Sequence, residues 1–171
     1  MARIIGKGHE ALRRGRWSTV GAEYFITLCT ASKRSGLTAP IVTNELIAGA
    51  LQLEQESAWG VRTMTVMPDH THLLVTLGEP HDLSASIRLF KSRLARTLRS
   101  SDLHWERSGF DHRLRAEENR LPVFQYIFLN AYRAKLLTPD QRWPGYYCHP
   151  DDWAWFEPLT NESCPFPEWL L

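Results

Sequence analysis

Long apolar runs are missing from this sequence of 171 residues. No stretch of about 18 or more consecutive apolar residues occurs, so no transmembrane helix is expected. The N-terminal MARIIGKGHE lacks the apolar core of a secretory signal, and neither repeats nor low-complexity segments are present. We therefore expect one soluble, cytoplasmic domain over residues 1–171.

Cysteine is also scarce, with three residues in the chain, Cys29, Cys148 and Cys164. An odd number without CxxC spacing argues against a disulfide framework and against a structural zinc site. We expect all three to be reduced thiols.

Excess charge of one sign is absent overall, since the formal net charge is +1, but charge is unevenly distributed along the chain. Residues 1–34 carry a net +5 and residues 85–120 a net +4, whereas residues 35–84 carry −5 and residues 121–171 carry −3. Two basic surfaces on a neutral protein suit a polyanionic partner. Charge alone favours the alternative that these side chains are ordinary solvated surface.

Hydrophobic patterning predicts a series of elements. Residues 23–30 and the pair 61–68 and 70–77 are rich in aromatic and β-branched residues, and the pair reads as a hairpin. Helices are predicted at 43–59, capped by Thr43 or Asn44, at 84–100, and at 121–137, opened by Pro122. Residues 104–119 read as irregular or short β structure, and the Trp- and Pro-rich tail, residues 138–171, as a loop-like segment packing on the domain.

This order of elements predicts an α+β fold, a ferredoxin-like split βαβ sandwich. Helices would cover one face of an antiparallel sheet, and the other face would be open for a site. The basic segment 1–34 would lead into the first strand.

The stretch VMPDHTHLLVTL, residues 66–77, places His70 and His72 one residue apart in a predicted strand. Residues i and i+2 of a strand point to the same face, so the two imidazoles would lie in parallel as a two-nitrogen metal site. The alternative, that both are ordinary hydrogen-bonded sheet histidines, is equally compatible with a lone His-x-His.

The last predicted helix carries three polar side chains that bear on this choice. Tyr126 and Asn130 are four residues apart and share a helix face, and Arg133 lies about one turn beyond. If that face met the histidines, two imidazoles and an amide oxygen would suit Mg²⁺ or Mn²⁺, and Tyr126 could act as a nucleophile. A tyrosine packed at the edge of the core is the alternative for Tyr126.

Four stretches together resemble a known family: LRRGRWSTVGAEYFITLCT, MPDHTHLLV, GFDHRLRAEEN and YIFLNAYRAKLL. They are similar to segments of the single-tyrosine HUH transposases, in particular the REP-associated tyrosine transposases of bacteria. Thr71 stands where the family has a bulky apolar residue, Asp69 where it commonly has Asn, and Ala131 where it has Pro. None of these departures removes a reactive group.

The resemblance implies cleavage of single-stranded DNA beside REP-type hairpins. Tyr126 would form a 5′-phosphotyrosine, and His70, His72 and Asn130 would hold Mg²⁺ or Mn²⁺. It also favours a monomer over a dimer. The residues expected to bind DNA are Arg13, Arg14, Arg16, Trp17, Arg88, Lys91, Arg96, His112, Arg115 and Arg133.

Two other functions remain open. One is a domesticated protein that binds hairpin DNA with little catalysis. The other is a ferredoxin-like RNA-binding module in which Trp17, Tyr24 and Phe25 stack on bases.

Overall fold

The computed structural model describes residues 18–160, in which five strands form one antiparallel sheet of order β4-β1-β3-β2-β5. The strands are β1 (Glu23–Cys29), β2 (Trp59–Val66), β3 (His70–Leu77), β4 (Phe110–Arg113) and β5 (Tyr146–Cys148). The helices are η1 (Ala31–Lys33), α2 (Pro40–Gln55), α3 (Leu83–Ser100), α4 (Leu121–Arg133), α5 (Pro150–Phe156) and η2 (Glu157–Leu159). The predicted α+β class, the hairpin of β2 and β3 and the three long helices are confirmed.

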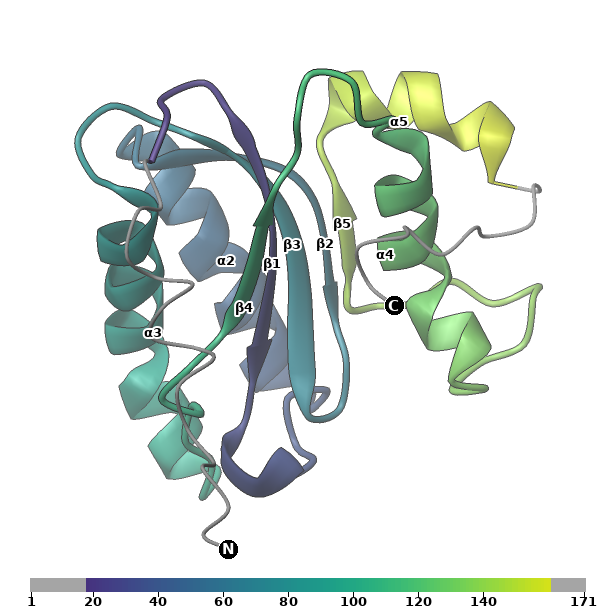
Figure 1. Ribbon diagram of the computed structural model, residues 1–171. Helices are drawn as coiled ribbons and strands as arrows, with labels where there is room; N and C mark the ends of the chain where they lie inside the picture. The colour runs from purple at the N-terminus through teal and green to yellow at the C-terminus, as the bar shows by residue number, and fades with distance from the viewer. Residues whose placement is uncertain (1–17, 161–171) are drawn as a thin grey trace, which may run out of the picture.

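The main core lies between the sheet and the helix pair α2 and α3, which occupy one side of it in Figure 1. Phe90, Leu94 and Leu98 recur along α3 at helical spacing and are buried against the sheet. Asp82 begins this helix, since its carboxylate accepts a hydrogen bond from the backbone N–H of Ala85 at 2.6 Å. The apolar stripe and the cap together fix α3 on this face.

Helix α2 begins three residues earlier than predicted. Pro40 occupies its first turn after Ala39, and neither Thr43 nor Asn44 caps it. The Thr43 hydroxyl instead donates to the carbonyl of Leu37 at 2.9 Å, inside the first turn. Proline suits a first helical turn because its φ is already helical and its missing N–H would have no partner there.

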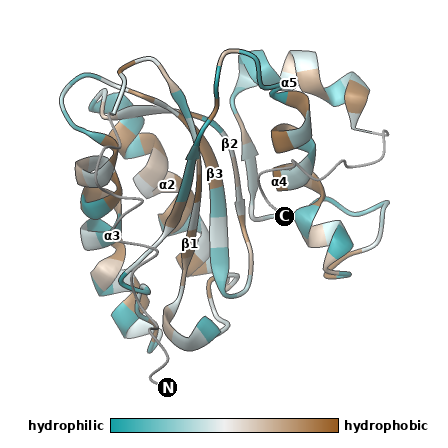
Figure 2. Ribbon diagram, in the orientation of Figure 1, coloured by the Kyte–Doolittle hydropathy of each residue, from teal (hydrophilic) through white to brown (hydrophobic). Residues whose placement is uncertain are grey.

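The opposite face of the sheet is covered in part rather than open. Helices α4 and α5 lie on that side (Figure 1), and their buried residues Phe124, Ile127 and Phe156 pack on Phe25 of β1 and Leu74 of β3. Figure 2 shows a hydrophilic stretch of β3 among mostly apolar central strands. Any site on this face therefore lies beside α4.

The segment after residue 138 was expected to be loop-like, and that expectation was wrong for residues 146–156. Tyr146–Cys148 pairs with β2 as the edge strand β5, and α5 follows at once with His149 as its N-cap. Tyr146 packs against the second layer and Tyr147 against the main core, an alternation that the irregular Trp and Pro spacing did not reveal. Within residues 18–160, none of the helices has the length and apolar character needed to cross a membrane.

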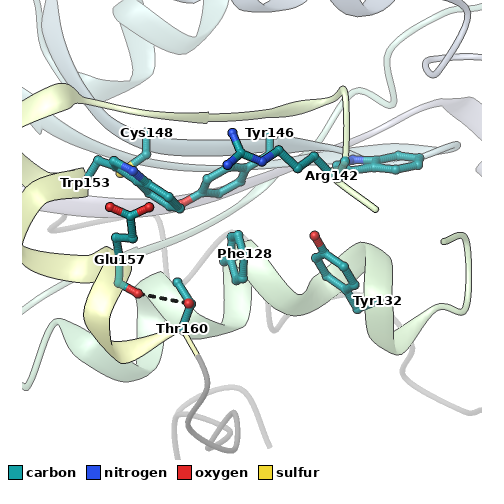
Figure 3. Close-up of a pocket in the computed structure, with 9 residues that line it drawn as sticks. Phe128, Tyr132, Arg142, Tyr146, Cys148, Trp153, Glu157 and Thr160 are labelled. Carbon is teal, nitrogen blue, oxygen red and sulfur yellow. Dashed lines mark hydrogen bonds between the residues drawn. The ribbon is translucent and has the colours of Figure 1, made fainter. Parts of the chain in front are cut away.

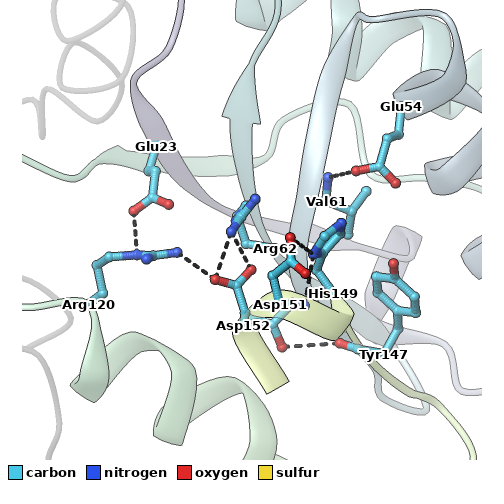
Figure 4. A network of polar contacts seen from close by, with 10 residues as sticks. Glu23, Glu54, Val61, Arg62, Arg120, Tyr147, His149, Asp151 and Asp152 are labelled. Atoms are coloured by element: carbon cyan, nitrogen blue, oxygen red, sulfur yellow. Dashed lines mark hydrogen bonds and ion pairs between the residues drawn. The ribbon is translucent and has the colours of Figure 1, made fainter. Parts of the chain in front are cut away.

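A polar network ties the second layer to the sheet (Figure 4). Asp152 of α5 is buried and binds Arg62 of β2 at 2.7 Å and Arg120, just before α4, at 3.2 Å. Arg120 also binds Glu23 of β1 at 2.9 Å. One carboxylate thus links two helices to a central strand, which fixes where α4 begins.

Replacing Asp152 by Ala should lower the free energy of unfolding by about 2–4 kcal/mol, because it leaves two partly buried guanidiniums without their shared partner. Urea denaturation measures the change. Arg34→Ala is the control, since Arg34 pairs with Asp102 at an exposed position and its loss should cost less than about 1 kcal/mol. Equal effects of the two substitutions would contradict the role given to Asp152.

Candidate functional site

His70 and His72 meet Tyr126 on the face of the sheet that α4 covers. The strand period of two directs His70, His72 and Leu74 to this side, while Leu73, Val75 and Leu77 enter the main core. The ring centroids of His70 and His72 are 4.7 Å apart, and those of His72 and Tyr126 are 5.1 Å apart. The sequence-based expectation that the tyrosine helix faces the histidine strand agrees with this arrangement.

His72 is held in a fixed orientation by β1. Its Nδ1 lies 2.8 Å from the hydroxyl of Thr27, its direct partner across the strands, and its ring stacks on Phe25 with centroids 5.3 Å apart. Its Nε2 is buried, and within the described residues it has no hydrogen-bond partner. A buried polar atom of this kind usually has a ligand or a water as its partner.

Burial lowers the pKa of His72 well below its ordinary value, and the nearby charges of His70 and Lys33 act in the same direction. The imidazole is therefore neutral at physiological pH. A neutral imidazole keeps one nitrogen lone pair, which is the form that binds metal ions.

His70 is oriented by its own neighbour in sequence. The Nδ1 of His70 lies 2.6 Å from Oδ1 of Asp69, the residue at which the family pattern commonly has Asn. A carboxylate on one imidazole nitrogen fixes the tautomer and leaves Nε2 as the other functional atom. The departure at Asp69 thus supplies an orienting contact, while Thr71 lies buried and donates to the carbonyl of Thr65 at 2.9 Å.

An opening of about 460 Å³ lies over the two histidines and Tyr126. Its remaining walls are Thr27 and Cys29 of β1, Lys33 after β1, and Phe110 of β4. Sequence reasoning missed Lys33 and Phe110. A signal was available in the strand register, because a first strand paired with β3 brings Cys29 opposite His70 and carries the following turn past the histidines.

Arg133 and Asn130 extend the site along α4. The Arg133 guanidinium carbon lies 5.9 Å from the centre of the Tyr126 ring, so a cation accompanies the phenol. Asn130 is half-buried one turn beyond Tyr126, but it is not among the residues that line the opening. Among residues 18–160, no group of three or more His, Cys, Asp or Glu side chains is arranged to hold a metal ion.

The model of the family "Transposase IS200 like" matches residues 18–114, which is more than half of the chain. The chain belongs to the IS200-like transposase family. Members of this family are HUH nucleases, and the family implies a divalent metal. The matched residues include His70 and His72 and end before α4, so Tyr126 and Asn130 lie outside them.

The fold of the chain is similar to that of a solved transposase over most of its length. A REP-associated tyrosine transposase bound to a REP hairpin is 21% identical, covers 86% of this chain and 89% of its own, and has a TM-score of 0.71. A candidate transposase from Deinococcus radiodurans R1 is 20% identical, covers 74% and 95%, and has a TM-score of 0.48. No curated protein matches the chain.

The residues predicted to bind DNA in this transposase belong to four parts of the chain: the N-terminal segment, α3, the β4–α4 region and the end of α4. Arg13, Arg14, Arg16 and Trp17 lie outside the described residues. Arg88 and Arg96 are exposed on α3, which lies across the sheet from His72 and Tyr126, and the Lys91 ammonium donates to the carbonyls of Glu106 and Ser108. Any DNA that α3 binds would therefore lie on the other side of the sheet from the opening.

His112 and Arg115 both engage Glu118. The His112 Nε2 lies 3.1 Å from the Glu118 carboxylate, and the backbone N–H of Arg115 donates to it at 2.7 Å. These contacts close the loop between β4 and α4. His112 and Arg115 therefore each have a contact with Glu118 within the protein. Their contact with DNA remains a prediction.

The RNA-binding arrangement predicted as an alternative is wrong in one respect. Tyr24 is 4% exposed and faces the main core, and Phe25 is fully buried beneath Tyr126 and α4. Neither ring can stack on a base, because both are buried within the protein.

A second pocket, of about 390 Å³, lies between α4 and the β5–α5 segment. Figure 3 shows Phe128 and Tyr132 on α4 facing Tyr146 and Trp153 across it. The hydroxyl of Thr63 lies 3.1 Å from that of Tyr146 and donates to it, and burial raises the pKa of the Tyr146 phenol. The residues that line this pocket include no pair of histidines. We interpret the pocket as a gap in the packing between α4 and the β5–α5 segment.

Cys148, which lines this second pocket, should react slowly with iodoacetamide in the folded protein. Burial raises the pKa of its thiol to about 11, so the thiolate fraction at pH 8 is roughly 0.1%, against about a quarter for an ordinary thiol. We expect labelling at least about 50-fold slower in native buffer than in concentrated urea, measured by peptide mass spectrometry. Equal rates would mean that β5 and α5 do not stay packed on α4.

Proposed function

We propose that this IS200-like transposase is a metal-dependent single-stranded DNA endonuclease and strand transferase that cleaves next to REP-type hairpins through a 5′-phosphotyrosine intermediate. The observation that carries the proposal is the meeting of Tyr126 with His70 and His72 in one opening. A tyrosine and a histidine pair from separate elements have no packing reason to converge beside an open space. They do suit phosphodiester cleavage by a tyrosine next to a metal site.

The two histidines that line the opening fit a divalent metal, and we propose His70 and His72 as its ligands. We propose Asn130, on α4 outside the lining of the opening, as a third ligand. His72 offers a buried, unpartnered Nε2 on a neutral ring, and His70 is oriented by Asp69 through its other nitrogen. Two imidazoles and an amide oxygen leave room for oxygen ligands, which suits Mg²⁺ or Mn²⁺. When bound, such an ion would draw electron density from a phosphate oxygen and neutralise charge that builds on it.

Tyr126 acts as the nucleophile in this proposal. Its phenol oxygen bonds to the scissile phosphorus as the bond from phosphorus to the 3′ oxygen breaks, which leaves a 5′-phosphotyrosine and a free 3′-hydroxyl. A phenol is a weak nucleophile at neutral pH unless a cation favours the phenolate, and Arg133 lies over the Tyr126 ring. The packing of the ring against Phe25 and His72 restricts its direction of attack.

The hairpin substrate is supported by the solved REP-associated relative, which is bound to a REP hairpin. On this chain, the proposed DNA contacts are Arg13, Arg14, Arg16, Trp17, Arg88, Lys91, Arg96, His112, Arg115 and Arg133. Guanidiniums next to a tryptophan in the N-terminal segment combine phosphate contacts with a stacking surface, as single-strand recognition requires. The exposed arginines of α3 would contact a duplex stem without reading its sequence.

Tyr126→Phe should abolish a covalent protein–DNA adduct that the wild type forms. The probe is a synthetic pool of single-stranded DNA with a GC-rich hairpin and randomised flanks, incubated with Mn²⁺ and resolved on a denaturing gel. Tyr132→Phe is the matched control, since Tyr132 lies on the same helix and its hydroxyl donates to the carbonyl of Gln141. His70→Ala should reduce the adduct by at least about 100-fold.

Tight binding of the hairpin pool without any adduct from the wild type would contradict the enzyme claim and leave a hairpin-binding protein with little catalysis. An adduct that persists in Tyr126→Phe would show that another residue is the nucleophile.

Thr27→Val should weaken Mn²⁺ binding about 10-fold or more, because the lost hydroxyl no longer orients His72. Isothermal titration of the protein without DNA measures this independently of cleavage. Thr76→Val is the control, since Thr76 lies in β3 four residues beyond His72 and pairs with Glu23 of β1 rather than with a histidine. Unchanged affinity in Thr27→Val would argue against His72 as a ligand.

A further inference from the structure

Phe110 and Lys33 line the opening but have no part in the proposed cleavage. Phe110 belongs to β4, at the edge of the sheet, and Lys33 belongs to the turn after β1. They stand beside the histidine pair on different elements. An aromatic ring can stack on any base, and an ammonium ion can contact a phosphate, so together they can bind a nucleotide whatever its base.

Phe110 presents a large apolar surface where an edge strand would normally be polar. Its side chain is 43% exposed, although it lines the opening with Tyr126 and contacts Phe25 with ring centroids 6.2 Å apart. Phe110 pairs with Thr27, and Thr27 pairs with His72, so Phe110 and His72 stand in one row two strand spacings apart, about 10 Å. A base resting on Phe110 would therefore have its phosphate close to the histidines.

Lys33 reaches the opening through an unusual backbone conformation. Ser32 and Lys33 both have positive φ, 57° and 54°, a region that side chains other than glycine adopt at a cost. The turn is stabilised by Thr30, whose hydroxyl donates to the carbonyls of Arg34 and Asp69 at 2.7 and 3.0 Å. The surroundings thus impose a strained turn that places an ammonium beside the site.

The Lys33 ammonium donates to the sulfur of Cys29 at 2.9 Å. The register pairs Cys29 with His70, so the ammonium lies at the His70 end of the opening while Phe110 lies at the Thr27 end. The sulfur satisfies one donor of an ammonium that has three. The remaining donors can serve a phosphate oxygen, and within residues 18–160 the nearby carboxylates of Asp69 and Glu106 act on Lys33 through their charge.

We propose that Phe110 and Lys33 form a nucleotide subsite for single-stranded DNA, in which Phe110 stacks on the base beside the scissile phosphate and Lys33 contacts a phosphate oxygen. This subsite deepens the proposed function and rests on it for the identity of the nucleic acid. It accepts any base, because every base has a face to stack on. Sequence preference must then come from other parts of the protein.

The test measures binding of fluorescein-labelled dT12 by anisotropy in the presence of EDTA, so that neither metal nor cleavage contributes. Phe110→Leu should weaken binding by about 5-fold or more, whereas Phe110→Tyr should bind as the wild type does. Trp155→Leu is the matched control, since Trp155 is also 43% exposed but lies on α5 and does not line the opening. It should leave the affinity unchanged.

Lys33→Met should lower the slope of log affinity against log salt concentration by about 0.7, the value for one phosphate contact on a single strand. Lys135→Met is its control, because Lys135 also has a positive φ, 55°, and is exposed at the end of α4. The control should keep the wild-type slope. A structural role of the turn alone would change the affinity without changing the slope.

Wild-type affinity in Phe110→Leu, or no binding of dT12 by the wild type, would overturn the subsite. A change in mass by sedimentation in Phe110→Leu, without a change in dT12 affinity, would also overturn it and assign the ring to contacts between copies of the chain. The subsite stands on its own if Phe110→Leu and Lys33→Met behave as expected but no covalent adduct forms in the hairpin experiment. In that case only the proposed cleavage falls.

Discussion

The two-residue period of β3 is the constraint on which the rest of the site depends. Leu73, Val75 and Leu77 enter the main core, so His70 and His72 must point to the other face. A slip of one residue would bury the imidazoles among leucines and expose the leucines to the second layer. The same alternation places Thr27 and Phe25 of β1 beside His72, because β1 pairs with β3 over seven residues. The core therefore enforces the register that assembles the functional face.

The second layer completes the site by bringing Tyr126 to that face. Phe124 and Ile127 bury the adjoining surface of α4, and the contacts of Arg120 with Glu23 and Asp152 fix its beginning. Tyr126 then points toward His72, at the boundary between packed core and opening. The β5–α5 segment supports α4 from behind through Tyr146, Trp153 and Phe156. Stability of this layer and positioning of the phenol are thus consequences of the same contacts.

The sequence was informative where one local pattern decides the outcome. Strand alternation predicted the shared face of His70 and His72, and helical spacing placed Tyr126 and Arg133 on one side of α4. Prediction from the sequence failed where a residue distant in the chain determines the local structure. The strand character of Tyr146–Cys148 exists only because β2 offers an edge, and Lys91 looked like a surface cation until the loop at Glu106 and Ser108 folded onto it. Lys33 reaches the site because the turn at Ser32 and Lys33 has positive φ. Glycine is the usual sign of such a turn in a sequence, and these two positions carry none.

The charges around the opening favour an anion over a cation as the larger ligand. His72 is neutral because it is buried, and the carboxylate of Asp69 is engaged by His70. The hydrogen bond to Cys29 raises the pKa of Lys33, so its ammonium stays charged at physiological pH, and Arg133 adds a second cation over the Tyr126 ring. Such an opening binds a metal ion more weakly on its own than with a phosphate present, since no described carboxylate lines the opening. Metal and DNA should therefore bind with positive coupling, each increasing the affinity of the other by the same factor.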